Sequence, residues 1–149
     1  LVVPGKIPQG DVVRLESNIE NQTVKVANPF KNAAEEDTRY SDTLVVADKD
    51  YQIQFFAEDN SFNITLLDQD IWKARAEAEA KLLERLHVSK EDACKLKVSL
   101  YVPISVNKVV FGQNLGLSFC PDSIQLPDKS TTPMEGIGTQ DSNGPNDGQ

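Results

Sequence analysis

Two stretches in the middle of the chain alternate between apolar and polar side chains, and this pattern leaves few choices for the fold. Residues 51–55 are Tyr-Gln-Ile-Gln-Phe, and residues 62–66 are Phe-Asn-Ile-Thr-Leu. A period of two residues is typical of a β-strand with one buried face. Because the turn-forming residues 58–61 lie between the two stretches, the sequence predicts a β-hairpin.

The segment after this hairpin predicts an amphipathic helix over residues 71–86. Asp68 and Asp70 precede it and can cap its N-terminus, where negative charge is favoured. Opposite charges such as Arg75 and Glu79 are one turn apart, on or near the face expected to be exposed. The apolar residues recur at the spacing of a single helical face: Ile71, Ala74, Ala78, Leu82 and Leu86.

The later elements are shorter. Ser89, followed by acidic residues, predicts the start of a second helix that ends near residue 94 or 95. Residues 97–102 alternate again and predict a third strand that ends at Pro103. We therefore expect an α+β fold, in which a small antiparallel sheet, the β-hairpin plus a third strand, is packed by one long and one short helix. The expected order is β-β-α-α-β, and residues 44–47 predict a further short strand.

Composition divides the chain into three parts. Residues 1–43 combine prolines with an acidic run, and we expect an extended or flexible arm and an acidic linker. Residues 44–126 form the expected compact α+β domain. Residues 127–149 are rich in Gly, Pro and small polar side chains, which bury too little surface to offset chain entropy, so we expect a disordered polar tail.

The charge of the chain excludes several partners. The formal net charge is −8, and the sequence contains no basic stripe of the kind that binds nucleic acid. An anionic membrane surface would repel the chain for the same reason. No apolar run approaches the roughly 18 residues that cross a bilayer. Because the chain begins with Leu1 rather than Met, we expect a signal peptide or an N-terminal membrane anchor upstream, and contact with a membrane only through such an anchor.

The two cysteines, Cys94 and Cys120, leave two states open. A disulfide would close a loop of about 27 residues and stabilise the domain by roughly 3.5 kcal/mol. The alternative is a pair of buried reduced thiols, and the choice depends on the redox compartment. The spacing is too wide for a redox-active Cys-x-x-Cys pair. A zinc site needs about four ligands, and two cysteines with the single histidine, His87, are too few, so we expect no metal.

We find no pattern typical of catalysis. His87 follows the expected helix, where a capping role is the simpler interpretation, and no serine lies in a Gly-x-Ser-x-Gly turn. The paired carboxylates at residues 48 and 50, 58 and 59, and 68 and 70 lie in turn-like sequence, where Asp is favoured for local hydrogen bonds. Phosphate-binding and dinucleotide motifs are absent from the sequence. We therefore expect no enzyme activity and no cofactor.

Residues 51–121 carry a series of short motifs: Phe62-Asn63-Ile64-Thr65-Leu66-Leu67, an Ala- and Glu-rich helix, Ala93-Cys94-Lys95-Leu96, Val102-Pro103, Ser105-Val106-Asn107, and Asn114-Leu115-Gly116-Leu117-Ser118-Phe119-Cys120-Pro121. In these motifs the chain resembles a family of short membrane-anchored extracytoplasmic proteins of uncharacterised function from bacteria of the candidate phyla radiation (Patescibacteria). The resemblance covers about half of the chain. It implies an N-terminal anchor, an exported domain and a Cys94–Cys120 disulfide, and it implies no catalytic residue.

The expected function is that of a non-catalytic extracytoplasmic interaction or structural module at the cell surface, with a protein or another component of the cell envelope as its partner. Two alternatives remain open, an accessory component of a pilus or secretion assembly and an envelope hydrolase with an unrecognised site. The candidate contact points are an unpaired sheet edge and the residues Trp72, Ser105, Asn107, Asn114, Leu115 and Gly116.

Overall fold

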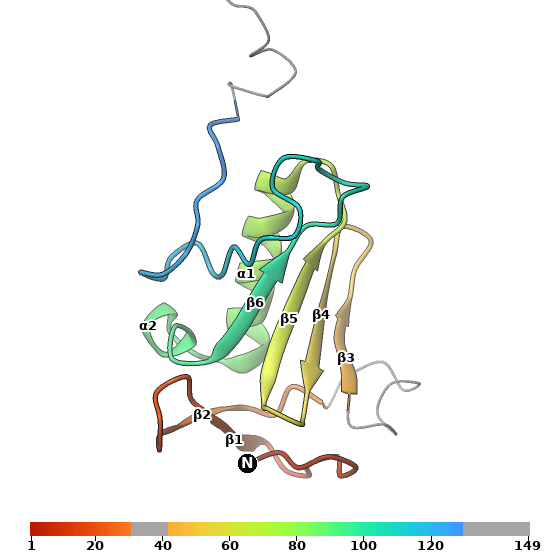
Figure 1. Ribbon diagram of the computed structural model, residues 1–149. Helices are drawn as coiled ribbons and strands as arrows, with labels where there is room; N and C mark the ends of the chain where they lie inside the picture. Colours follow the sequence, from red (N-terminus) through yellow and green to blue (C-terminus); the bar gives the residue numbers. More distant parts are fainter. Residues whose placement is uncertain (31–41, 130–149) are drawn as a thin grey trace, which may run out of the picture.

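A four-stranded sheet backed by one long helix forms the centre of the molecule. The computed structural model describes residues 1–30 and 42–129. Within these ranges the elements follow in the order β1-β2-β3-β4-β5-α1-α2-β6. Figure 1 shows α1 behind the sheet and the β1–β2 hairpin across its lower end. The α+β class is therefore confirmed, whereas most of the predicted acidic linker and of the polar tail lies outside the described residues.

The central hairpin is confirmed. Strands β4 (Tyr51–Phe56) and β5 (Ser61–Leu66) pair antiparallel. Their inward side chains are fully buried opposite one another, Ile53 beside Ile64 and Phe55 beside Phe62. The turn is closed by Asn60, whose backbone φ of 57° lies in the left-handed region that Asn tolerates. These strands form the middle of the sheet.

The long helix, α1 (Ile71–Leu86), begins and ends where the sequence predicts. The Asp70 carboxylate accepts a hydrogen bond from the Lys73 N–H at 3.2 Å, and His87 ends the helix in a left-handed conformation. Its predicted apolar face is buried against the sheet. One expectation for this helix is wrong, because Arg75 and Glu79 are not near the exposed side but are only 4% and 6% exposed.

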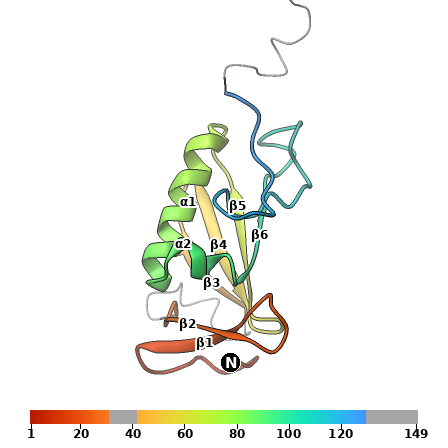
Figure 2. The same cartoon turned by 90° about the vertical axis from the view of Figure 1, so that its left-hand side faces the viewer.

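The last strand corrects the predicted sheet. The short helix α2 (Lys90–Ala93) is capped by Ser89 as expected and leads into β6 (Lys97–Tyr101). This strand pairs parallel to β5, with Leu100 opposite Ile64, so the prediction of an all-antiparallel sheet is wrong. The reason is that α1 returns the chain to the end at which β5 began, as Figure 2 shows, and a strand that follows such a crossover runs parallel.

A fourth strand completes this sheet. The predicted strand at residues 44–47 is present as β3 (Asp42–Ala47) and pairs antiparallel with β4. The strand order is β3-β4-β5-β6, so β3 and β6 are the two edges. Helix α1 covers one face of this sheet (Figure 2), and the side chains of β4 and β5 that point to the opposite face are half-buried.

The N-terminal residues correct a second prediction. They were expected to form an extended arm, but β1 (Val12–Glu16) and β2 (Thr23–Ala27) form an antiparallel hairpin. Leu15 and Val24 face each other in this hairpin and are buried. The side chain of Asn60 joins the hairpin to the central sheet, since its Oδ1 accepts from the Glu16 N–H and its Nδ2 donates to the Val2 carbonyl. The N-terminal part is therefore packed onto the domain.

After β6 the chain forms a loop and then an irregular segment that returns to α1. Leu115 and Leu117 of this segment are buried. Trp72 Nε1 donates to the Pro127 carbonyl at 2.8 Å, and the Lys129 ammonium lies 5.7 Å from the centre of the Trp72 ring. Among the described residues, none of the helices combines the length and apolar character that a bilayer crossing needs.

Candidate functional site

A groove follows the first half of β6 and is the best candidate for a functional site. It is a hollow of about 470 Å³, within the range of roughly 300–1,000 Å³ that is usual for ligand sites. Leu96 to Ser99 form one side, and the residues Leu117 and Cys120–Ser123 form the other. Asn18 of the β1–β2 turn and Asn114 lie among its lining residues as well. We call this hollow the β6 groove.

The upper end of the groove is closed by the chain itself. Asn114 Oδ1 accepts a hydrogen bond from the Leu100 N–H at 2.9 Å, and the Leu115 N–H donates to the Leu100 carbonyl at 2.8 Å. Both backbone groups of Leu100 are thus used on the side of β6 that faces away from β5. The segment that begins at Asn114 therefore occupies this part of the sheet edge as a partner strand would.

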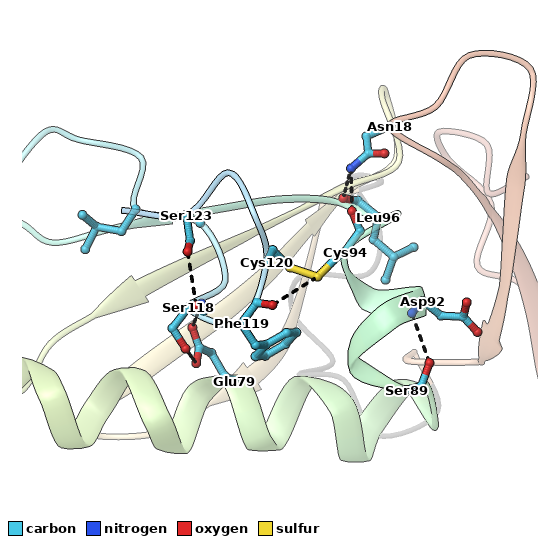
Figure 3. The surroundings of a disulfide bond; sticks show 12 residues. Asn18, Glu79, Ser89, Asp92, Cys94, Leu96, Ser118, Phe119, Cys120 and Ser123 are labelled. Carbon is cyan, nitrogen blue, oxygen red and sulfur yellow. Dashed lines mark hydrogen bonds between the residues drawn. A yellow bond between two sulfur atoms is a disulfide. The ribbon is translucent and has the colours of Figure 1, made fainter. Parts of the chain in front are cut away.

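The lower end is closed by the hairpin turn. The Asn18 N–H donates to the Lys95 carbonyl at 2.8 Å, and Asn18 Nδ2 donates to the carbonyls of Cys94 and Leu96. Figure 3 shows Asn18 reaching this backbone from the hairpin, close to the Cys94–Cys120 disulfide. The disulfide is thereby confirmed, and it joins the end of α2 to the opposite side of the groove.

A buried ion pair holds the far side of the groove on α1. Arg75 Nη2 donates to the carbonyls of Leu115 and Gly116 at 3.1 and 2.9 Å. The Glu79 carboxylate accepts from both the N–H and the hydroxyl of Ser118, each at 2.6 Å (Figure 3). Arg75 Nε lies 3.3 Å from Glu79 Oε2, but without the alignment of a hydrogen bond. Burial lowers the pKa of Arg75, and the nearby Glu79 carboxylate opposes this shift.

Between the two closed ends, one residue of β6 keeps its outer backbone groups open. The N–H and C=O groups of a strand point alternately to its two sides, so Val98 points them outward as Leu100 does. Residues 1–30 and 42–129 supply no hydrogen-bond partner to these two groups. Val98 is itself one of the residues that line the β6 groove. An unpaired edge of this kind is a natural template for another extended chain.

The charges around the groove are unequal. Asp59 and Asp122 are both exposed and line it, and Lys97 is the lining ammonium group. Lys97 is already paired with Glu16. The Ser61 hydroxyl donates to Asp59 at 2.6 Å, whereas Asp122 lies exposed in the turn after the disulfide. The groove therefore carries an excess of negative charge.

A larger hollow of about 750 Å³ lies between α1 and the β1–β2 hairpin, and it is a weaker candidate. Its polar lining residues include Lys81, Glu84, Arg85 and His87. Arg85 donates to the carbonyls of Val45 and Pro29, so its guanidinium is already engaged. Lys81 and Glu84 pair at 2.9 Å, and His87 caps α1 as the sequence predicts.

The predicted contact residues do not form one surface. Asn114 and Gly116 line the β6 groove, and Leu115 is buried beside them. Ser105 and Asn107 lie in the preceding loop, where Asn107 Oδ1 accepts from the N–H groups of Val109 and Val110. Trp72 packs against the C-terminal segment on α1. The prediction missed Asn18 and Val98, because nothing in the sequence indicates which side of a strand remains unpaired.

Neither a metal-binding cluster of the described residues nor a known relative accompanies the groove. Within residues 1–30 and 42–129, His, Cys, Asp and Glu side chains do not gather in threes as a metal ion would require. Comparisons with protein-family models, with curated proteins and with solved structures found no match. The resemblance described above therefore stays a prediction.

Proposed function

We propose that this protein is a non-catalytic extracytoplasmic interaction module that binds a protein partner through the β6 groove. The observation that carries the proposal is the open backbone edge at Val98, which lies inside a hollow of ligand size. The groove is bounded by segments held in place by the disulfide and the Arg75–Glu79 pair. A binding surface supported on a fixed frame loses little entropy when it is occupied.

The extracytoplasmic location rests on the cysteine pair. Disulfides persist in oxidising compartments and are rare in the cytosol. The single bridge joins α2 to the far side of the groove, so an oxidising environment also preserves the proposed site. Attachment to the cell surface through an upstream anchor agrees with the resemblance to membrane-anchored proteins.

Two features favour binding over catalysis. His87 is the single histidine of the chain, and it caps α1 away from the β6 groove. The polar groups at the ends of the groove, the side chains of Asn18 and Asn114, are engaged in backbone hydrogen bonds. Such groups position a backbone, whereas hydrolysis needs a nucleophile within reach of a base.

Site-specific photo-crosslinking tests the proposal. A photoreactive phenylalanine analogue replaces Pro121, which is exposed and lines the groove, or Lys73, which is exposed on α1. Both proteins are incubated with the envelope fraction of the source cells and irradiated. We expect one discrete protein adduct from position 121 that is absent from position 73. Equal labelling at the two positions, or no adduct at position 121, would contradict the proposal.

A further inference from the structure

We propose that the occupant of the β6 groove is a short extended peptide segment that carries a positive side chain and pairs with the backbone of Val98. This inference rests on the proposed function and specifies the chemistry of its partner. The peptide would donate one hydrogen bond to the Val98 carbonyl and accept one from the Val98 N–H. It would extend the sheet by one strand, a recognised mode of peptide binding.

The arrangement of hydrogen bonds along β6 supports this assignment. Leu100 uses its outward N–H and C=O with Asn114 and Leu115, and the Leu96 carbonyl accepts from Asn18. The edge is thus occupied above and below by pieces of this chain that act as partial strands. Only the groups of Val98 stay available between them in the described structure. A peptide backbone supplies the one donor and the one acceptor that would pair with the outward groups of Val98.

The ends of the groove limit the length of the occupant. Four residue steps separate Leu96 from Leu100. At about 3.3 Å per residue, the open interval along β6 is roughly 13 Å. Three or four extended residues span this distance. A longer strand would collide with the Asn18 turn or with Asn114, so the partner must enter and leave the groove at an angle to β6.

The charge of the groove favours a cationic side chain in this peptide. Asp122 is exposed, while the ammonium of Lys97 is paired with Glu16 and also donates to the Asp59 carbonyl oxygen. The whole chain carries a formal charge of −8, which attracts a basic partner over a longer range. A Lys or Arg next to the paired peptide group would lie within reach of Asp122.

The substitution Val98→Pro gives a selective test, because it removes the outward N–H without removing a bond of the β5–β6 ladder. Proline is tolerated on edge strands where its nitrogen faces away from the sheet. Val98→Thr is the matched control, since it keeps both the β-branched shape and the N–H. Asp122→Asn tests the charge separately and leaves the backbone unchanged.

The probes are three capped tetrapeptides, a length that fits the open interval along β6. The first alternates Val and Lys, the second replaces Lys by Glu, and the third is the first peptide with its central backbone nitrogens methylated. Binding is followed by the amide signals of the ¹⁵N-labelled protein in two-dimensional NMR. We expect the Val-Lys peptide to shift signals at Asn18, Val98 and Asn114. Methylation of the peptide, or Val98→Pro, should weaken binding about tenfold, as expected from the loss of one or two hydrogen bonds.

The remaining outcomes are decisive as well. Asp122→Asn should weaken binding of the Val-Lys peptide at low salt. The loss should be the same whether residue 98 is the native Val or the control Thr. Absence of shifts near Val98 at millimolar peptide overturns the inference. If the methylated peptide binds as tightly as the Val-Lys peptide, the inference is also overturned, and this result does not depend on whether Val98→Pro folds.

A dimer that forms with rising protein concentration and shifts the same amide signals would instead assign the groove to a second copy of the chain. In each of these cases a groove-specific photo-adduct would leave the broader proposed function standing.

Discussion

Glu79 joins a segment after β6 to the long helix, and its environment makes it sensitive to substitution. The carboxylate is only 6% exposed and neutralises Arg75, which is 4% exposed. Glu79→Ala leaves the Arg75 charge buried without its counterion and removes two hydrogen bonds from Ser118. We expect a loss of about 3–5 kcal/mol in the free energy of unfolding, measured by urea denaturation.

The double replacement Arg75→Met with Glu79→Leu is the control for this prediction. It removes both charges and fills the space with apolar side chains, so no unpaired ion remains. We expect it to cost clearly less than the sum of the two single substitutions. Additive losses would show that the two groups do not interact across the 3.3 Å that separates them.

Asp70 makes the stability of α1 depend on pH. A hydrogen bond from the Lys73 N–H, followed by the Lys129 ammonium, lowers the pKa of Asp70 below its ordinary value of 3.8. A lowered pKa in the folded state means that the stabilisation is complete above the ordinary value and is lost as the pH falls through the folded-state pKa. Asp70→Ala should therefore lower the melting temperature at pH 7, and the difference from the native protein should narrow below pH 4.

Asp70→Asn separates the charge of this cap from its hydrogen bond. Asparagine can still accept from the Lys73 N–H but cannot titrate. We expect this variant to stay closer to the native melting temperature at pH 7 than Asp70→Ala does. A difference between native protein and Asp70→Ala that stays constant from pH 7 to pH 2.5 would contradict the linkage.

At the scale of elements, the β1–β2 hairpin depends on a few polar contacts with the rest of the domain. Asn18 contributes three of these through its N–H and its side-chain amide. Asn18→Ala removes the side-chain bonds, so we expect faster amide hydrogen exchange in β1 and β2 and little change in β4 and β5. Glu20→Ala, in the same turn and exposed, is the control. Equal exchange in the two variants would show that the side-chain amide of Asn18 does not hold the hairpin in place.

The elements that could be predicted from the sequence are those whose pattern is both long and local. Alternation over residues 51–66 and the helical period over residues 71–86 specify β4, β5 and α1, and Asp70 and Ser89 mark helix starts. The hairpin of β1 and β2 was missed because each strand has five residues and prolines flank the pair. Its burial depends on contacts with Asn60 and Lys95, which are distant in sequence.

The arrangement of the whole molecule could be predicted only in part. The sequence indicated that β6 exists, but its direction is set by the path of α1 and not by its own residues. The candidate site was harder to predict than the fold. Val98 differs from its neighbours in β6 only in that no described segment pairs with its outward backbone groups, and a sequence pattern does not show this. Of the predicted contact residues, Asn114 and Gly116 line the groove. Their segment ends at Cys120, and the disulfide to Cys94 holds that end beside β6.

The disulfide acts on the whole domain, because it joins α2 to the segment that returns from β6 to α1. The two cysteines are 26 residues apart. A loop of this length corresponds to roughly 3.5 kcal/mol in the chain-entropy model. Replacing both cysteines by serine should lower the free energy of unfolding by about this amount, measured in denaturant without reductant. The native protein in reductant should behave like the variant, and a native melting temperature indifferent to reductant would contradict the prediction.

The parallel pairing of β6 with β5 also sets an order in which the domain can be completed as it emerges from a ribosome or a translocation channel. The β4–β5 turn is local and can close as soon as Leu66 is free, whereas β5 has no second neighbour until Tyr101 has followed. During that interval β5 exposes a bare edge to other chains, because α1 packs on a face of the nascent sheet and not along that edge. Slow synthesis across residues 67–96 would therefore prolong the stage at which this protein is most prone to aggregate.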